Sequence, residues 1–144
     1  MNKGISLIKK YEGCKLKAYL CPAKIPTIGW GNTMYENGAK VKLGDEITQQ
    51  RADELLLHVV GYFEKEIQKL VTCKLSDNQF GALTSFAYNL GIGNLRVSTL
   101  LKKVNANPID PTIKDEFLKW NKAGGKVLAG LTKRRQEEAT LYFA

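Results

Sequence analysis

The periodicity of the apolar residues changes near residue 48, and this change limits the folds open to the chain. From residue 48 to residue 71, apolar residues recur every three or four positions, which is the spacing of one helical face. They are Ala52, Leu55, Leu56, Val59, Phe63, Ile67 and Leu70. At 1.5 Å per residue this helix extends roughly 36 Å. A helix of that length could join two lobes.

The residues before this helix carry strand and turn signals. A short helix is predicted over 3–11, followed by a half-buried strand over 15–20, a turn over 21–26 and a second strand over 27–31. The two strands predict a β-hairpin. Asn37-Gly38 predicts a further tight turn, because this dipeptide tolerates two positive φ angles.

The residues after it are predicted to be helical. Ser76 and Gln79 form a capping pattern that starts one helix, which ends near Gly91. Another helix starts at 110–111 and stops at 124–125, and a last one covers 131–143. With strands near the N-terminus and helices elsewhere, the sequence predicts an α+β fold that is predominantly helical.

Composition excludes several classes of protein. The 144 residues have a net charge of +8 and average apolar content, as expected for one globular domain. Basic residues outnumber acidic ones in both halves, but no nucleic-acid-binding motif is present, so we expect no nucleic-acid partner. No segment has the length and apolar character of a membrane span or of a secretory signal, so we expect no stable membrane insertion.

No metal or cofactor site is expected. The three cysteines, Cys14, Cys21 and Cys73, lack paired spacing, which argues against structural zinc and a disulfide framework. The only histidine, His58, lies mid-helix without signs of a catalytic triad.

Glu12 is the first candidate for chemistry. It ends the apolar stripe of Ile5 and Ile8, and Gly13 then breaks the helix before a strand. A carboxyl at such a corner is partly desolvated, which raises its pKa and suits it to donate a proton near neutral pH. The alternative is a solvated glutamate at a helix end.

The spacing of Glu12 with two later residues resembles a catalytic signature. Glu12, Cys21 and Thr27 stand at E-x8-C-x5-T, and the chain resembles phage-type lysozymes, the endolysins of glycoside hydrolase family 24. Further motifs similar to the family follow in order at 16–19, 27–31, 75–80, 86–91 and 123–138.

The resemblance implies a lysozyme-like two-lobe fold with a cleft, in one catalytic domain over 1–144. A β-rich lobe would cover 13–47, a helical lobe 1–12 plus 72–144, and a connecting helix 48–71. The implied activity is that of a muramidase, which hydrolyses the β-1,4 bond between N-acetylmuramic acid and N-acetylglucosamine in peptidoglycan. The implied protein is a cofactor-free monomer that binds peptidoglycan glycan strands and reaches the wall from the host cytoplasm after a holin-type membrane lesion.

The resemblance also assigns roles. Glu12 would be the general acid, and Thr27 would position the water or pack beside the anomeric carbon. Gly31 and Asn32 would contact substrate, although many family members carry histidine at the position of Asn32.

Cys21 departs from the aspartate usual in the family. Inverting hydrolysis ordinarily uses a second carboxylate to activate water. A thiolate could do this if nearby lysines lower the Cys21 pKa. Alternatively Cys21 only packs, and the protein is a lytic transglycosylase, which needs no such base, or a non-catalytic peptidoglycan-binding module.

The last motif contains Lys133, Arg134 and Arg135. These cations near a helix start oppose the helix dipole, which suggests that they bind an anionic envelope component or order the cleft. The interpretation that we prefer is that Arg134 pairs with Glu137 and Glu138, three and four residues later.

Overall fold

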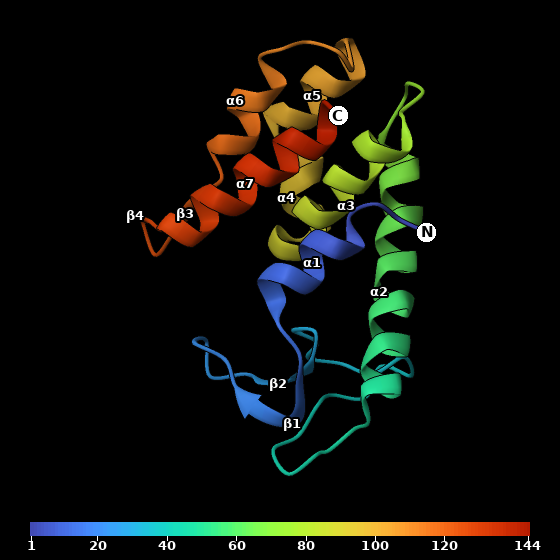
Figure 1. The fold of residues 1–144 in the computed structure, drawn as a ribbon, viewed down its shortest axis with the longest axis vertical. Coiled ribbons are helices and arrows are strands. Elements are labelled where there is room, and N and C mark those ends of the chain that lie inside the picture. The colour runs from blue at the N-terminus through green and yellow to red at the C-terminus, as the bar shows by residue number, and fades with distance from the viewer. The chain divides into compact units, whose positions relative to one another are not determined.

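Helices fill most of the chain, and its strands are short. The computed structural model describes residues 1–144. The elements are α1 (Ile5–Glu12), β1 (Lys15–Leu20), β2 (Pro26–Gly29), α2 (Gln49–Leu70), α3 (Asp77–Leu90), α4 (Ile92–Val97), α5 (Thr99–Ala106), α6 (Ile113–Leu118), β3 (Lys122–Ala123), β4 (Lys126–Val127) and α7 (Ala129–Tyr142) (Figure 1). The predicted α+β, predominantly helical fold class is confirmed.

The chain divides into two compact units. One consists of residues 8–62, and the other combines residues 1–7 with residues 63–144. Both boundaries fall inside helices, α1 and α2, so each of these helices contributes residues to both units. The bounds therefore differ from the division expected from the sequence, which assigned each helix as a whole.

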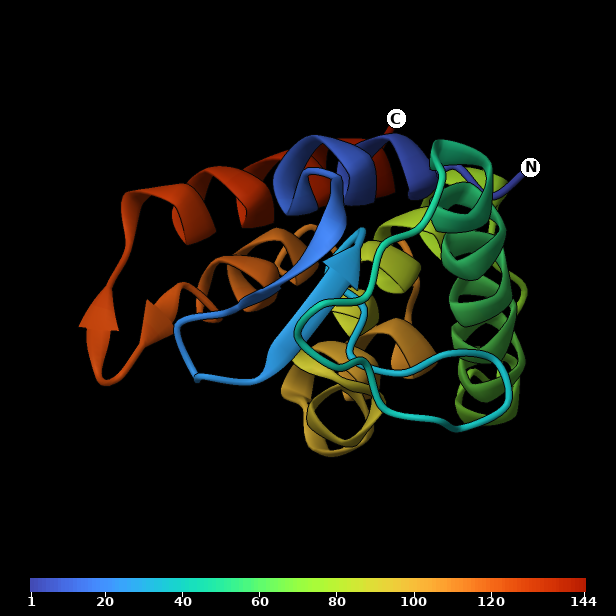
Figure 2. The same ribbon diagram turned by 90° about the horizontal axis from the view of Figure 1, so that it is seen from below.

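The unit of residues 8–62 contains the predicted hairpin. β1 and β2 pair antiparallel, with Tyr19 opposite Thr27 and Leu20 opposite Pro26 (Figure 2). The ladder is irregular between Lys15 and Tyr19. The expected alternation of buried and exposed residues in β1 is wrong, because its first three residues are all exposed.

The turn predicted at Asn37-Gly38 is present in a different form. The Gly38 N–H donates to the Tyr35 carbonyl oxygen at 3.0 Å. Gly38 has φ +85°, but Asn37 does not adopt a positive φ, so only one residue of the dipeptide uses that freedom. Only an isolated bridge between Met34 and Lys40 forms beside the turn.

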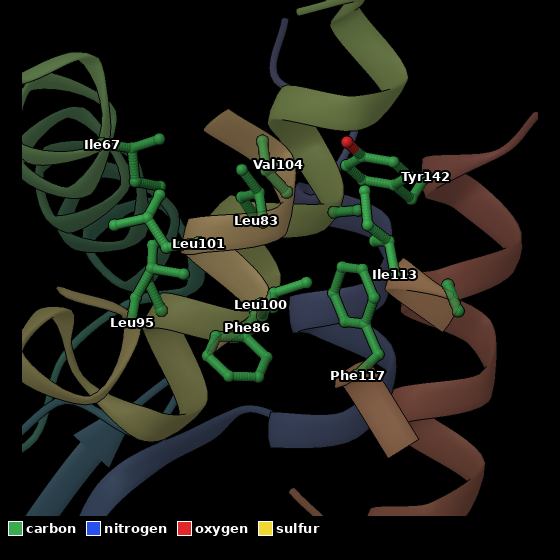
Figure 3. Packing of buried hydrophobic residues seen from close by; sticks show 13 residues of the cluster. Ile67, Leu83, Phe86, Leu95, Leu100, Leu101, Val104, Ile113, Phe117 and Tyr142 are labelled. Carbon is green, nitrogen blue, oxygen red and sulfur yellow. The ribbon is translucent and has the colours of Figure 1, made fainter. Parts of the chain in front are cut away.

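The other unit is built around α3. The predicted capping box is confirmed: the Ser76 hydroxyl accepts from the Gln79 N–H, and the Gln79 side chain accepts from the Ser76 N–H. Residues 81–87 of the helix are all buried. Figure 3 shows the apolar cluster that surrounds α3, to which α2, α4, α5, α6 and α7 also contribute. Its labelled members are Ile67, Leu83, Phe86, Leu95, Leu100, Leu101, Val104, Ile113, Phe117 and Tyr142.

The N-terminal segment packs against α3 at a pair of glycines. A β-carbon on Gly81 would lie 2.6 Å from the Gly4 nitrogen, so only glycine allows the two backbones to approach this closely. The Asn2 side-chain amide donates to Thr84 Oγ1 at 3.0 Å and to Glu64 Oε2 at 3.2 Å. Residues at the start of the chain thus belong to the same unit as its second half.

Several elements differ from the sequence prediction. α4 and α5 were not predicted, and α6 ends at Leu118, well before the glycine pair at 124–125. Those glycines instead form the turn between β3 and β4, with φ +58° and +78°. No helix of the structure has both the length and the apolar character needed to cross a membrane.

The expected pairing of Arg134 with Glu138 is present, but both side chains are buried. Arg134, Arg135 and Glu138 are 3%, 0% and 0% exposed. Arg135 Nε lies 2.6 Å from Glu138 Oε1, and Ser85 donates to Glu138 Oε2 at 2.6 Å. The spacing predicted the pair correctly, but packing against α3 makes it a buried cluster.

Candidate active site

Glu12 is the last residue of α1. Ile5 and Ile8 form the apolar face of this helix, and both side chains are buried. The Glu12 side chain at the end of the helix is half-buried. Gly13 follows with φ +67°, and its N–H donates to the Lys9 carbonyl oxygen at 3.2 Å. A residue in this left-handed conformation ends a helix. Glycine adopts it most readily, because a β-carbon would make it costly. The carboxyl group is thereby placed at the junction of α1 and β1.

Gly31 lies directly against the Glu12 carboxylate. A β-carbon on Gly31 would be 2.6 Å from Glu12 Oε1 and 3.4 Å from its carboxyl carbon. Gly31 also has φ +81°, which glycine adopts without strain. The sequence predicts a substrate contact at Gly31. In the structure, the group that approaches it is the carboxylate of the candidate acid.

The β1–β2 hairpin brings Cys21 and Thr27 together. Cys21 follows β1, and its N–H donates to the Ile25 carbonyl oxygen at 3.1 Å across the turn. Lys24 closes this turn with φ +60°, the only positive φ at a residue other than glycine. Thr27 is buried in β2 and donates its hydroxyl to the same Ile25 oxygen at 2.8 Å. The Cys21 side chain is half-buried and carries a free thiol.

Hydrogen bonds in this turn lower the pKa of the Cys21 thiol. The largest contribution comes from the Ile25 backbone, and the Ala23 backbone and the Thr27 hydroxyl add to it. Such donors stabilise a thiolate more than a thiol. The expected lowering is therefore present, but the turn produces it rather than the neighbouring lysines.

Tyr19 is a residue of this region that the sequence reasoning did not single out. Burial raises the pKa of its hydroxyl, and the negative charges of Glu12 and Cys21 raise it further. Tyr19 is therefore neutral near pH 7 and is influenced by both candidate catalytic groups. Its position opposite Thr27 in the hairpin explains this, and the strand pattern alone did not reveal it.

Asn32 has a buried place in the same unit. Its side chain is only 6% exposed, and its backbone exchanges two hydrogen bonds with Ile28, of 2.8 and 2.9 Å. Its Oδ1 lies 3.4 Å from the position that a β-carbon on Gly29 would occupy. These contacts fix the turn between Ile28 and Asn32, the turn that contains Gly31.

The only histidine, His58, is exposed on α2.

The unit of residues 8–62 contains all five candidate residues, Glu12, Cys21, Thr27, Gly31 and Asn32. Within it Glu12 contacts Gly31, Cys21 interacts with Thr27, and the charges of Glu12 and Cys21 both raise the pKa of Tyr19.

Comparison with known proteins identifies the family of the chain. The phage lysozyme family matches residues 9–138, a stretch that includes all five candidate residues. The chain belongs to the phage lysozyme family. This agrees with the resemblance to phage-type lysozymes that the motifs indicated.

Relatives of this phage lysozyme family member have similar sequences and folds. The endolysin of Bacillus phage B103 is 44% identical over 142 residues, which are 97% of this chain and 52% of that relative. The chain thus spans about half the length of this curated relative. The structure of an endolysin from Escherichia coli O157:H7 phage FAHEc1 has a TM-score of 0.88 and 37% identity, with 99% of this chain and 91% of that one covered. The muramidase domain of SpmX from Asticaccaulis excentricus has a TM-score of 0.86 and 30% identity, with 100% and 97% covered. The predicted lysozyme-like fold is confirmed.

Proposed function

We propose that the protein is an endolysin with muramidase activity, which hydrolyses the β-1,4 bond between N-acetylmuramic acid and N-acetylglucosamine in bacterial peptidoglycan. The observation that supports it most is the half-buried Glu12 carboxylate held against Gly31 at the end of α1. The similarity to endolysins and to a muramidase domain supports the substrate.

In the proposed reaction, Glu12 acts as general acid. Its carboxyl proton passes to the glycosidic oxygen as the bond from that oxygen to the anomeric carbon breaks. A water molecule attacks the anomeric carbon and gives up a proton, which the Cys21 thiolate accepts. The hydrogen-bonded turn around Cys21 supports this role, because it lowers the pKa of the thiol. Exchange with solvent then restores both groups.

Thr27 supports Cys21 in this mechanism. Its hydroxyl has one proton, which it donates to the Ile25 carbonyl oxygen in the structure; turned toward Cys21 instead, the same hydroxyl stabilises the thiolate. A hydroxyl both donates and accepts, so it can also orient the attacking water. Contacts of Gly31 and Asn32 with the sugar, a monomeric state, and the route from the host cytoplasm through a holin-type lesion stay predictions.

The proposal is tested on purified sacculi. Glu12→Gln should lower the rate of clearing by about 10²–10⁴-fold, the usual contribution of a general acid. Glu46→Gln is the matched control, because Glu46 is an exposed carboxylate of the same unit that pairs only with the exposed Lys17 at 3.5 Å. It should clear sacculi at the wild-type rate. Full activity of Glu12→Gln would remove Glu12 as the acid.

Analysis of the released muropeptides decides between reaction types. Hydrolysis gives a reducing muramic acid end, whereas a lytic transglycosylase gives a 1,6-anhydro end. Because the proposed base is Cys21, Cys21→Asp should keep hydrolysis and Cys21→Ser should lose most of it. Binding to sacculi without any product would identify a non-catalytic module.

A further inference from the structure

We propose that Asp53 is a positioning residue for the Glu12 carboxylate, acting through Trp30 and the adjoining Gly31. This inference rests on the proposed function, since it assigns a role to residues around the proposed acid. Asp53 itself lies in the first turns of α2 and is not among the motif residues.

Three side chains converge on the Asp53 carboxylate. The Trp30 indole N–H donates to Asp53 Oδ1 at 2.9 Å, and the Gln49 amide donates to the same oxygen at 3.1 Å. Lys9 Nζ lies 3.9 Å from that oxygen and 5.3 Å from the centroid of the Trp30 ring. One oxygen atom therefore links α1, the turn after β2 and the start of α2.

Each partner stands next to a part of the candidate active site. Lys9 is on α1, and its carbonyl oxygen accepts the N–H of Gly13, the residue that ends the helix after Glu12. Trp30 is bonded directly to Gly31, the residue in contact with the Glu12 carboxylate. A shift of Trp30 therefore moves the backbone against which that carboxylate rests.

The charge of Asp53 suits it to this role. The Trp30 hydrogen bond, with help from Gln49 and Lys9, lowers the pKa of the Asp53 carboxyl, so the group is ionised near pH 7. An ionised carboxylate accepts two or more hydrogen bonds and attracts an ammonium group, and such charge-assisted bonds are the stronger ones.

The position of Glu12 matters because general acid catalysis requires the proton within hydrogen-bond reach of the leaving oxygen. Misplacement of a catalytic group by about 1 Å can cost on the order of 10²-fold in rate. Gly31 adopts φ +81° and has no side chain of its own to hold it in place. The backbone hydrogen bonds between Ile28 and Asn32 close its turn. The bond from the neighbouring Trp30 to Asp53 is the side-chain contact that fixes this turn to α2.

The experiment compares Asp53→Ala, Asp53→Asn and Trp30→Phe with a matched control. Tyr35 donates its hydroxyl to Asp45 Oδ2 at 2.8 Å in the same unit, so Tyr35→Phe also removes one hydrogen bond from an aromatic donor to an aspartate. The measured quantities are kcat and KM on a soluble peptidoglycan fragment, and Tm.

Asp53→Ala and Trp30→Phe should lower kcat by at least about tenfold, with KM changed by less than about twofold. Tyr35→Phe should lower Tm similarly and leave kcat unchanged. Asp53→Asn keeps an acceptor for Trp30 and should recover most of kcat. If Trp30→Phe fails to fold, the two Asp53 variants decide, because both retain the indole ring.

Three outcomes would overturn the proposal: wild-type kcat in Asp53→Ala and Trp30→Phe, an equal loss of kcat in Tyr35→Phe, or no recovery in Asp53→Asn. Failure of the proposed function is recognised separately. In that case the wild-type protein releases no muropeptides, or Glu12→Gln remains active, whatever the Asp53 variants do.

Discussion

The backbone of Gly31 lies against the carboxylate of Glu12, so that a β-carbon on Gly31 would be 2.6 Å from Oε1. The contact joins the turn after β2 to the end of α1. The carboxylate is the mobile end of a side chain, whereas Gly31 is part of the backbone. A clash at this contact would therefore displace the carboxylate first.

Gly31→Ala should reduce activity far more than stability. Its β-carbon would push Glu12 Oε1 away, and the positive φ of +81° adds backbone strain of roughly 1–2 kcal/mol. Gly38→Ala is the matched control, because Gly38 has φ +85° and open space around the added β-carbon. Urea unfolding should show similar losses for both variants, and sacculus clearing should fall only in Gly31→Ala. Equal activity of the two would contradict the importance of this contact.

The pH dependence of activity should follow the Cys21 thiol. Its pKa is lowered, so the thiolate forms at a lower pH than an ordinary thiolate. The reaction needs this thiolate together with a protonated Glu12, so activity should follow a bell-shaped pH profile whose two limbs belong to the pair. In Cys21→Asp the profile should lie at lower pH, because an aspartate ionises near a pKa of about 3.9. The measurement is kcat/KM against pH for both proteins, and identical profiles would show that Cys21 is not the base.

Thr27→Val tests the origin of the lowered thiol pKa. The change removes the hydroxyl that stabilises the thiolate but keeps the shape of the side chain, so the pKa of Cys21 should rise. The pH dependence of Cys21 alkylation by iodoacetamide, read by peptide mass spectrometry, reports this pKa. Lys24→Gln is the control and should leave the Cys21 pKa unchanged, because the hydrogen bonds of the turn, and not the lysine charge, lower that pKa.

The Glu36–Arg51 pair should stabilise the fold in a defined pH window. Both Arg51 Nη atoms lie 2.9 Å from Glu36 oxygens, and this pairing lowers the Glu36 pKa from 4.5 to about 2. Because the folded-state pKa is depressed, the stabilisation is complete above the unfolded pKa and is lost as pH falls through about 2. Arg51 is 41% exposed, so Glu36→Gln should cost only about 0.5–1 kcal/mol at pH 7.

Urea unfolding at several pH values measures this effect. The difference between wild type and Glu36→Gln should shrink from pH 5 to pH 2. Glu46→Gln, which breaks the exposed 3.5 Å pair with Lys17, should have a smaller effect throughout. If the difference in free energy of unfolding between wild type and Glu36→Gln does not depend on pH, the ion pair is not its source.

Glu138→Gln should destabilise the protein strongly. Glu138 is fully buried, and its carboxylate faces Arg135 at 2.6 Å and Arg134 at 3.4 Å. Removing its charge leaves two buried guanidinium groups uncompensated, which typically costs about 3–5 kcal/mol. Glu66→Gln, at a pair in which the Lys69 side chain is 71% exposed and the Glu66 side chain 21% exposed, should cost less than about 1 kcal/mol. Comparable losses in the two variants would contradict the buried cluster.

Local signals in the sequence predicted the elements that local interactions determine. Ser76 and Gln79 define the start of α3 by hydrogen bonds within four residues, and the structure has this capping box. The strand signals predicted the β1–β2 hairpin, which antiparallel pairing confirms. The spacing of Glu12, Cys21 and Thr27 indicated the family, which the comparisons confirm.

Features that depend on distant contacts could not be predicted in this way. The Gly31 contact joins residues from different elements, and no local pattern shows that Glu12 would rest there. Apart from the Thr27 hydroxyl, the donors that lower the Cys21 pKa are backbone groups, whose directions depend on the conformation of the turn at Lys24. Likewise, the spacing of Arg134 and Glu138 shows that they can pair, but only packing against Ser85 makes the pair buried.

The docking of the N-terminal segment on α3 has a consequence for synthesis. Asn2 donates to Thr84, a residue 82 positions later, and Gly4 meets Gly81 in the same place. While the ribosome extends the chain, the first residues must wait until α3 has emerged before they can take up their final position. The residues of the other unit, 8–62, leave the ribosome before α3 does, so the unit that contains the N-terminus is completed last although its first residues are made first.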